Sequence, residues 1–212
     1  MKAFWNNVVL QVLQQLADLM LLNLVWLVFF LPLLTAGSAA AAMFTVADSI
    51  REGGGVRVLH TFLDSFRRNF RRCLVPTLLV MAGVALLVVD FFLARYFNDM
   101  FRAILFGTLI SLSLLLCLAV CHLFPLLAVT EETWRVLLPR AIAMGAGRPA
   151  RTLLIVFLHV CPLIVAVGSP QLFLHGIPLW GCIYFSGVSY VTARLLKKDL
   201  HFPADDGERR MA

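Results

Sequence analysis

Charged residues are scarce in this sequence. Asp, Glu, Lys and Arg make up 14% of its 212 residues, against roughly 25% in a typical soluble domain. Hydrophobic residues make up 61%, against roughly 45–50% in such a domain. This composition excludes an ordinary soluble enzyme as the first interpretation. Charge is missing altogether from four long runs, which are residues 19–36, 74–89, 103–130 and 152–193.

Recognised catalytic and metal-binding patterns are missing as well. The five cysteines form no CxxC pair and lie within or beside the apolar runs, which is typical of packing residues rather than of a disulfide framework. The sequence contains no serine or cysteine triad pattern, no phosphate-binding loop and no paired-acid hydrolase site. We therefore expect no enzyme activity, no catalytic residue, no bound metal and no cofactor.

The charge-free runs predict membrane-spanning helices, because about 18 or more apolar residues are needed to cross ~30 Å of hydrocarbon. The run at 152–193 holds 42 residues and would be ~63 Å long as one helix. It must therefore turn, and the Gly and Pro residues at 168–171 and 176–178 supply the break. The predicted fold is all-α, a single polytopic membrane domain over residues 1–212. The predicted spans are 18–35, 74–94, 103–127, 152–167 and 178–195, followed by a polar tail at 197–212.

A corner and a basic segment follow the first span. Pro32 and the small residues 37–42 predict a turn and close helix packing, with a second helix that reaches Arg51. Residues 56–73 then predict a basic amphipathic helix that lies on the cytoplasmic face of the membrane. Its predicted apolar arc consists of Leu59, Phe62, Leu63, Phe66, Phe70 and Cys73. The candidate residues for binding lipid or a partner are Arg67, Arg68, Arg71, Arg72, Phe62, Phe66 and Phe70.

The net charge of +6 fits membrane orientation better than nucleic-acid binding, because the positive residues flank apolar spans. With five spans, 15 of the 18 Lys and Arg residues belong to segments on one side. Positive loops stay in the cytoplasm, so the N-terminus is expected outside and the C-terminus inside. Membrane lipids are expected partners, and nucleic acid is not.

Polar residues inside the predicted spans are functional candidates because they are costly to place in hydrocarbon. They are Asp18, Asn23, Asp90, His122 and His159. Asn23 needs a hydrogen-bond partner, so its face of the helix is expected to point inward. The two carboxylates are expected near the outer ends of their spans. Cys117, Cys121, His122, His159 and Cys161 could together bind a soft metal, but no acidic group supports them and packing is the simpler interpretation.

The segments just described resemble the YesL-like family of bacterial membrane proteins. The resemblance rests on Asn23-Leu24-Val25-Trp26, on the corner that begins with Leu31-Pro32, and on residues 62–70, which are similar to a basic segment with a Phe-x-x-Phe pattern in that family. It covers about residues 20–75. This chain departs from the family at residues 36–39, where a proline is usual. The resemblance implies a location in the cytoplasmic (inner) membrane of a bacterium, an unknown function, and genes often placed beside carbohydrate import systems.

The expected function is an accessory or interaction component of a transport system, with carbohydrate uptake implied by the resemblance alone. The partner would be an ABC-type import permease or its ATPase subunit. One alternative is a small transporter that uses Asp18, Asn23 and Asp90 along an internal path. The other is a membrane metalloenzyme that uses the Cys and His residues. No motif specifies the substrate or the oligomeric state.

Overall fold

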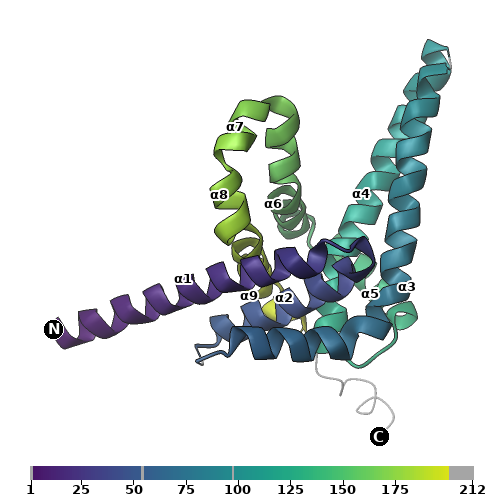
Figure 1. The fold of residues 1–212 in the computed structure, drawn as a ribbon. Helices are drawn as coiled ribbons and strands as arrows, with labels where there is room; N and C mark the ends of the chain where they lie inside the picture. The colour runs from purple at the N-terminus through teal and green to yellow at the C-terminus, as the bar shows by residue number, and fades with distance from the viewer. Residues whose placement is uncertain (1, 54, 97, 201–212) are drawn as a thin grey trace, which may run out of the picture.

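The computed structural model describes residues 2–53, 55–96 and 98–200, and every regular element in this part of the chain is a helix (Figure 1). The predicted all-α class is therefore confirmed. The long helices are α1 (Lys2–Phe30), α2 (Ala36–Arg51), α3 (Val58–Leu93), α4 (Asp99–Val129), α5 (Trp134–Gly147), α6 (Pro149–Gly168) and α9 (Phe185–Leu200). The short elements are η1 (Leu33–Thr35), η2 (Ala94–Tyr96), α7 (Pro170–His175), α8 (Ile177–Leu179) and the π-helical turn η3 (Trp180–Tyr184). Most of the predicted polar tail, residues 201–212, lies outside the described residues.

Five helices of the described chain are long and apolar enough to cross a membrane, as predicted, but they are not the predicted set. They are Val9–Phe30, Leu33–Arg51, Val58–Leu93, Asp99–Val129 and Pro149–Gly168. The stretch Leu33–Arg51 was expected to be helical but not to be a crossing segment. The predicted span 178–195 is divided among α8, η3 and α9, so none of these elements is long enough by itself.

Helices α1 and α2 form an antiparallel hairpin. The chain leaves α1 after Phe30, and the hydroxyl of Thr35 donates to the carbonyls of Phe29 at 2.5 Å and Pro32 at 2.7 Å, which closes the corner. The hairpin brings Asp18 beside the loop that follows α2, where both line one pocket. This placement differs from the expectation that puts Asp18 near the outer end of its span and the loop on the cytoplasmic side, because that expectation assumed a single crossing before the loop.

Helix α3 joins two segments that were predicted to be separate, the interfacial helix at 56–73 and the span at 74–94. The composition changes from charged to apolar at residue 74, but helical hydrogen bonding continues across that point. Figure 1 shows that α3 bends part way along its length. Pro76 inside the helix explains the bend, because proline has no N–H to bond the carbonyl of Arg72. We refer to residues 58–73 of α3 as the basic arm.

Two hairpins rise on the same side of α1 (Figure 1). One pairs the second part of α3 with α4, and the other pairs α6 with α7 and α8. The second hairpin turns at Ser169 and Gly176, close to the breaks predicted from glycine and proline. The basic arm and α5 lie at the opposite end, at the base of the hairpins. The turns of both hairpins therefore point away from the basic arm.

Helix α2 lies at the centre and packs against α1, α3, α4 and α9. Its small residues make this possible, because short side chains let neighbouring backbones approach closely. Gly37 is the tightest point. A Cβ atom at this position would overlap the hydroxyl of Thr77 on α3 and the ring of Phe124 on α4. Glycine is therefore required here for close packing rather than for an unusual backbone conformation.

A second fixed point joins α1 to the π-helical turn η3. Asn23 is completely buried, and its Nδ2 donates to the carbonyls of Trp180 at 3.2 Å and Gly181 at 2.6 Å. Its Oδ1 accepts a hydrogen bond from the backbone N–H of Ser186 at 3.0 Å. The Asn23 amide thus bridges a carbonyl and an N–H that face each other across the widened turn. This structure agrees with the expectation that Asn23 faces inward and needs a partner.

Replacing Gly37 with alanine is expected to destabilise the fold by about 1–3 kcal/mol, the usual cost of adding a carbon to a packed core. Thermal unfolding in detergent would measure this loss, with a thiol-reactive dye that reports exposure of the buried Cys73 and Cys121. Gly107→Ala is the matched control, because a Cβ there meets nothing within 4 Å. If G37A unfolds at the same temperature as the unmodified protein, the close contact among α2, α3 and α4 is wrong.

Replacing Asn23 with leucine is expected to destabilise the protein by about 1–3 kcal/mol for each backbone group left unpaired in the interior. The same thermal assay measures this loss. Gln14→Leu is the control, because Gln14 is an exposed polar residue of the same helix. Equal unfolding temperatures for the two variants would show that Asn23 does not hold η3 against α1.

Candidate functional site: the basic arm and the central cavity

The phenylalanines of the basic arm form a row of aromatic contacts, in which Phe62 is buried and Phe66 and Phe70 are half-buried. Phe62 is completely buried, and its ring centroid lies 5.4 Å from that of Phe29 on α1. Phe66 lies 4.9 Å from the same ring, and Phe70 continues the row at 5.7 Å from Phe66. Phe62 and Phe66 therefore fasten the arm to α1.

The buried face of the arm is rotated relative to the predicted apolar arc. Its buried residues within α3 are Val58, Phe62, Ser65, Asn69 and Cys73. Leu59, which was placed on the predicted arc, is 52% exposed, whereas the polar residues Ser65 and Asn69 are buried. The prediction is right for Phe62 and Cys73 but wrong for Leu59, because it ranked residues by hydrophobicity alone. Buried polar residues cost little when each finds a hydrogen-bond partner.

Those partners form a polar chain that links three helices. The hydroxyls of Thr45 on α2 and Ser65 on α3 lie 3.0 Å apart. Asn69 donates to the carbonyl of Ser65 at 3.0 Å and to its hydroxyl at 3.3 Å. Arg72 donates to the side-chain oxygen of Asn69 at 3.3 Å. The polar chain therefore runs from α2 through the basic arm to Arg72.

Arg72 ends the polar chain at the C-terminus of α4. Its guanidinium donates to the carbonyls of Leu127 at 3.4 Å, Thr130 at 2.7 Å and Glu132 at 2.5 Å. The Glu131 carboxylate lies 3.7 Å away. A cation is favoured here because the last carbonyls of a helix carry partial negative charge and lack helical partners. Arg72 was predicted to be available to a lipid or partner, but its donors are used within the protein.

The remaining arginines of the arm face outward. Arg67, Arg68 and Arg71 are exposed. Within the described chain, none of the three forms an ion pair or a side-chain hydrogen bond. The arm thus carries three free positive charges on a helix whose other face is fixed to the protein.

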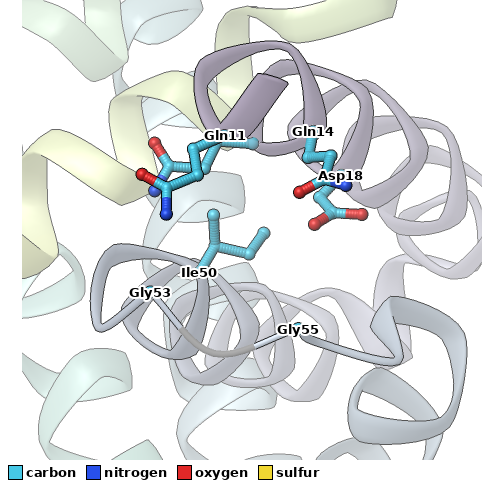
Figure 2. Close-up of a pocket in the computed structure, with 7 residues that line it drawn as sticks. Gln11, Gln14, Asp18, Ile50, Gly53 and Gly55 are labelled. Carbon is cyan, nitrogen blue, oxygen red and sulfur yellow. The ribbon is translucent and has the colours of Figure 1, made fainter. Parts of the chain in front are cut away.

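A small polar pocket lies where the α1–α2 hairpin opens. It has a volume of about 140 Å³ and is lined by Gln11, Gln14, Gln15, Asp18, Ile50, Gly53 and Gly55. Figure 2 shows Gln11, Gln14 and Asp18 reaching from α1 across the gap toward Ile50 of α2. Asp18, one of the two candidate carboxylates from the sequence, therefore lines this pocket.

The structure does not bring Asp18, Asn23 and Asp90 together. Asp18 lines the polar pocket, and the amide of Asn23 is occupied by the backbone of η3 and α9. Asp90 lies near the end of α3 at Leu93, in the hairpin that extends away from the other helices (Figure 1). An internal path lined by these three residues therefore has no counterpart in the structure.

The histidine and cysteine candidates are spread over two helices. His122 on α4 is buried, and its Nδ1 lies 3.0 Å from the carbonyl of Leu118. His159 on α6 makes the same contact with the carbonyl of Ile155 at 2.8 Å. Among the described residues, no group of three or more His, Cys, Asp or Glu side chains could hold a metal ion. The absence of a metal site remains a prediction.

A cavity of about 250 Å³ lies where α1, α2, α4, α6 and α9 converge. Its walls are mainly apolar and include Trp26, Phe44, Phe124 and Phe185. Of the candidates from the sequence, Cys121 and His159 line this space. We call it the central cavity.

Two features of these sites were missed by the sequence analysis. The polar residues of the arm could have been found from spacing, because 58, 62, 65, 69 and 73 recur every three or four residues, as one helix face requires. Trp26 was noted only as a neighbour of Asn23. Nothing in the sequence indicates that Trp26 and residues from four other helices line one cavity.

Comparisons with known proteins agree with the sequence resemblance. Residues 19–91 match the family described as "Protein of unknown function, DUF624", a region that runs from within α1 to near the end of α3. The chain is also 29% identical over 137 residues to the uncharacterized protein YesL of Bacillus subtilis (strain 168). That alignment covers 63% of this chain and 64% of YesL, which is less than two thirds of the relative's length. No solved structure gives a significant match. The matches to the family and to YesL confirm the resemblance to the YesL-like family that the sequence predicts.

Proposed function

We propose that this membrane protein is a non-enzymatic interaction component of a transport system, and that it binds its partner through the outward face of the basic arm. The observation that carries the proposal is the arrangement of Arg67, Arg68 and Arg71 as free charges on a helix that is fixed at its other face. A surface helix with free arginines can pair with carboxylates of a partner, often through two parallel hydrogen bonds per residue.

A role limited to anchoring fits this arrangement less well. An interfacial anchor uses its apolar face to enter the lipid, but Phe62 and Phe66 contact Phe29 instead. Lipid would then be held by the arginines alone, at about 1 kcal/mol for each charge near an anionic surface. The polar chain that ends at Arg72 adds rigidity, which lowers the entropy lost when the arm binds another protein.

The partner is expected to present an acidic surface on the cytoplasmic side. An ABC-type import permease or its ATPase subunit is the candidate that the family resemblance suggests, with carbohydrate as the imported substrate. A small transporter remains the second candidate, because residues from five helices line the central cavity. The residues first suggested for its path do not support it, since they lie apart.

The proposed orientation puts both ends of the chain in the cytoplasm of a bacterium, at its inner membrane. Because α1 and α2 form a hairpin, the start of α1 belongs to the same side as the basic arm. The hairpin turns after Leu93 and Gly168 belong to the other side. All Lys and Arg residues except Arg95 and Arg102, 16 of 18, are then cytoplasmic. This split is stronger than that of the expected arrangement with the N-terminus outside, which the proposal replaces.

The double substitution Arg67→Gln and Arg68→Gln is expected to leave folding intact and to weaken partner binding. The reason is that neither side chain holds part of the fold, whereas both can pair with a partner's carboxylates. Purification from native membranes in mild detergent, followed by mass spectrometry, would measure how much permease or ATPase subunit is retained.

Two control variants separate binding from folding. Arg194→Gln removes an exposed charge from α9 and should retain the partner. Arg72→Gln should lower the unfolding temperature, because it breaks the bonds to the end of α4. If the Arg67→Gln, Arg68→Gln protein inserts, stays stable and restores full function in a knockout host, the arm is only an anchor and the proposal fails.

The orientation is tested with reporter fusions. Green fluorescent protein, which fluoresces only when it folds in the cytoplasm, should be active at the N-terminus, Gly54, Gly147 and Ala212. Alkaline phosphatase, which is active only in the periplasm, should be active at Gln171. A fusion at the N-terminus that reports the periplasm would overturn the hairpin arrangement, because a hairpin cannot separate this end from Gly54.

A further inference from the structure

An open groove lies between α1 and the start of the basic arm. It has a volume of about 510 Å³, and its lining includes Leu21 of α1 and Leu59 and Leu63 of the arm. Leu21 and Leu59 are exposed, and Leu63 is half-buried. The groove therefore offers apolar surface that the protein itself does not cover.

The same groove holds one residue of each charge sign. Asp18 lines it from α1, and Arg57, the residue before α3, lines it from the other side together with His60. Within the described chain, neither Asp18 nor Arg57 takes part in an ion pair or a side-chain hydrogen bond. Two opposite charges that line one groove without pairing are both available to a ligand that carries both signs.

Asp18 also lines the small polar pocket of about 140 Å³, so the pocket and the groove adjoin at this residue. The pocket wall carries the carboxamides of Gln11, Gln14 and Gln15. Figure 2 shows the side chains of Gln14 and Asp18 reaching from α1 into the gap beside the loop after α2. Carboxylate and carboxamide oxygens both accept hydrogen bonds, so this pocket suits a cation with several N–H donors.

We propose that the groove and the pocket together bind one phospholipid whose headgroup carries a primary ammonium, as in phosphatidylethanolamine. The ammonium donates to Asp18 and to the carboxamides of the pocket, and the phosphate pairs with Arg57. An acyl chain lies along the leucines of the groove. The inference goes beyond the function proposed for the arm and does not depend on it, because Arg67, Arg68 and Arg71 line neither space.

The position of the groove along the chain favours a membrane lipid over a soluble compound. The membrane-length helix Leu33–Arg51 ends shortly before the arm begins at Val58. The groove therefore lies where the chain leaves the hydrocarbon, which is the level of the phospholipid headgroups. A free amine or phosphate compound would leave the three leucines of the groove uncovered, whereas a lipid covers them with its acyl chain.

The charge pattern separates this headgroup from two others. A phosphatidylglycerol headgroup has a phosphate for Arg57, but it has no positive charge for Asp18 and its negative charge is repelled by that carboxylate. A phosphatidylcholine headgroup is cationic at one end, but its three methyl groups replace the N–H donors that the pocket would accept. A primary ammonium meets both requirements.

Headgroup selectivity is the first test. Native mass spectrometry of the full chain, purified in mild detergent and titrated with phospholipids that have the same acyl chains, measures the affinity for each headgroup. We expect phosphatidylethanolamine to bind at one per chain. We expect phosphatidylglycerol and phosphatidylcholine to bind roughly three- to ten-fold more weakly, the effect of one net hydrogen bond at a partly exposed carboxylate. Equal affinities for the three lipids would overturn the proposal.

The substitution Asp18→Asn tests the ammonium end of the site. It should remove the preference for phosphatidylethanolamine and leave the affinity for phosphatidylglycerol no lower than in the unmodified protein. Asp64→Asn is the matched control, because Asp64 is an exposed acid of the basic arm that lines neither space. A D18N protein that keeps the headgroup preference of the D64N protein would overturn the proposal.

The substitution Arg57→Gln tests the phosphate end independently. It should weaken binding of all three lipids by roughly two- to five-fold, because each contains a phosphate and Arg57 is an exposed charge. Arg194→Gln, which removes an exposed charge outside both spaces, should bind like the unmodified protein. Equal affinities for the R57Q and R194Q proteins would place the phosphate elsewhere and overturn the proposal.

Free phosphoethanolamine distinguishes a lipid from a soluble ligand with the same headgroup chemistry. Added at the same concentration as phosphatidylethanolamine, it should leave the lipid bound, because it has no acyl chain to cover the leucines of the groove. Displacement of the lipid under these conditions would identify the soluble compound as the occupant and would overturn the assignment to a membrane lipid.

Discussion

The close packing of α2 is the constraint on which the rest of the structure depends. This helix contacts α1, α3, α4 and α9, and a single added carbon at Gly37 would collide with two of its neighbours. Tight approach of this kind is the main source of association between helices in a membrane, because lipid offers no hydrophobic advantage to burying apolar residues. Small residues in α2 therefore stabilise the packing of these helices, as large apolar residues do in the core of a soluble protein.

Directional hydrogen bonds then fix how the outer helices attach to this centre. Asn23 fastens α1 to the π-helical turn η3, and Arg72 fastens the basic arm to the end of α4. Both use side chains to satisfy backbone groups that regular helical bonding leaves open. In an apolar setting an unpaired backbone group is costly, so such contacts specify one arrangement of helices.

The two candidate sites lie on different parts of this framework. The arginines of the basic arm face outward, where charge can act on another protein or a membrane surface. The central cavity lies inward, where the indole of Trp26 meets mainly apolar walls. Helix α1 serves both, because Phe29 holds the arm while Trp26 lines the cavity. A change at one site could therefore reach the other through a single rigid helix.

The sequence by itself determined the helical class, the membrane setting and the end of α2 at Arg51, because these depend on composition and on local signals such as the glycines after Arg51. Only the tertiary structure decided that α1 and α2 form a hairpin, that Ser65 and Asn69 are buried, and that Asp18 and Arg57 line one groove. The reason is physical. The hydrophobicity of a segment indicates how strongly its side chains favour leaving water. In a membrane, an apolar side chain leaves water whether it contacts lipid or protein. Which face meets protein is set by close fit and by hydrogen-bond partners distant in sequence.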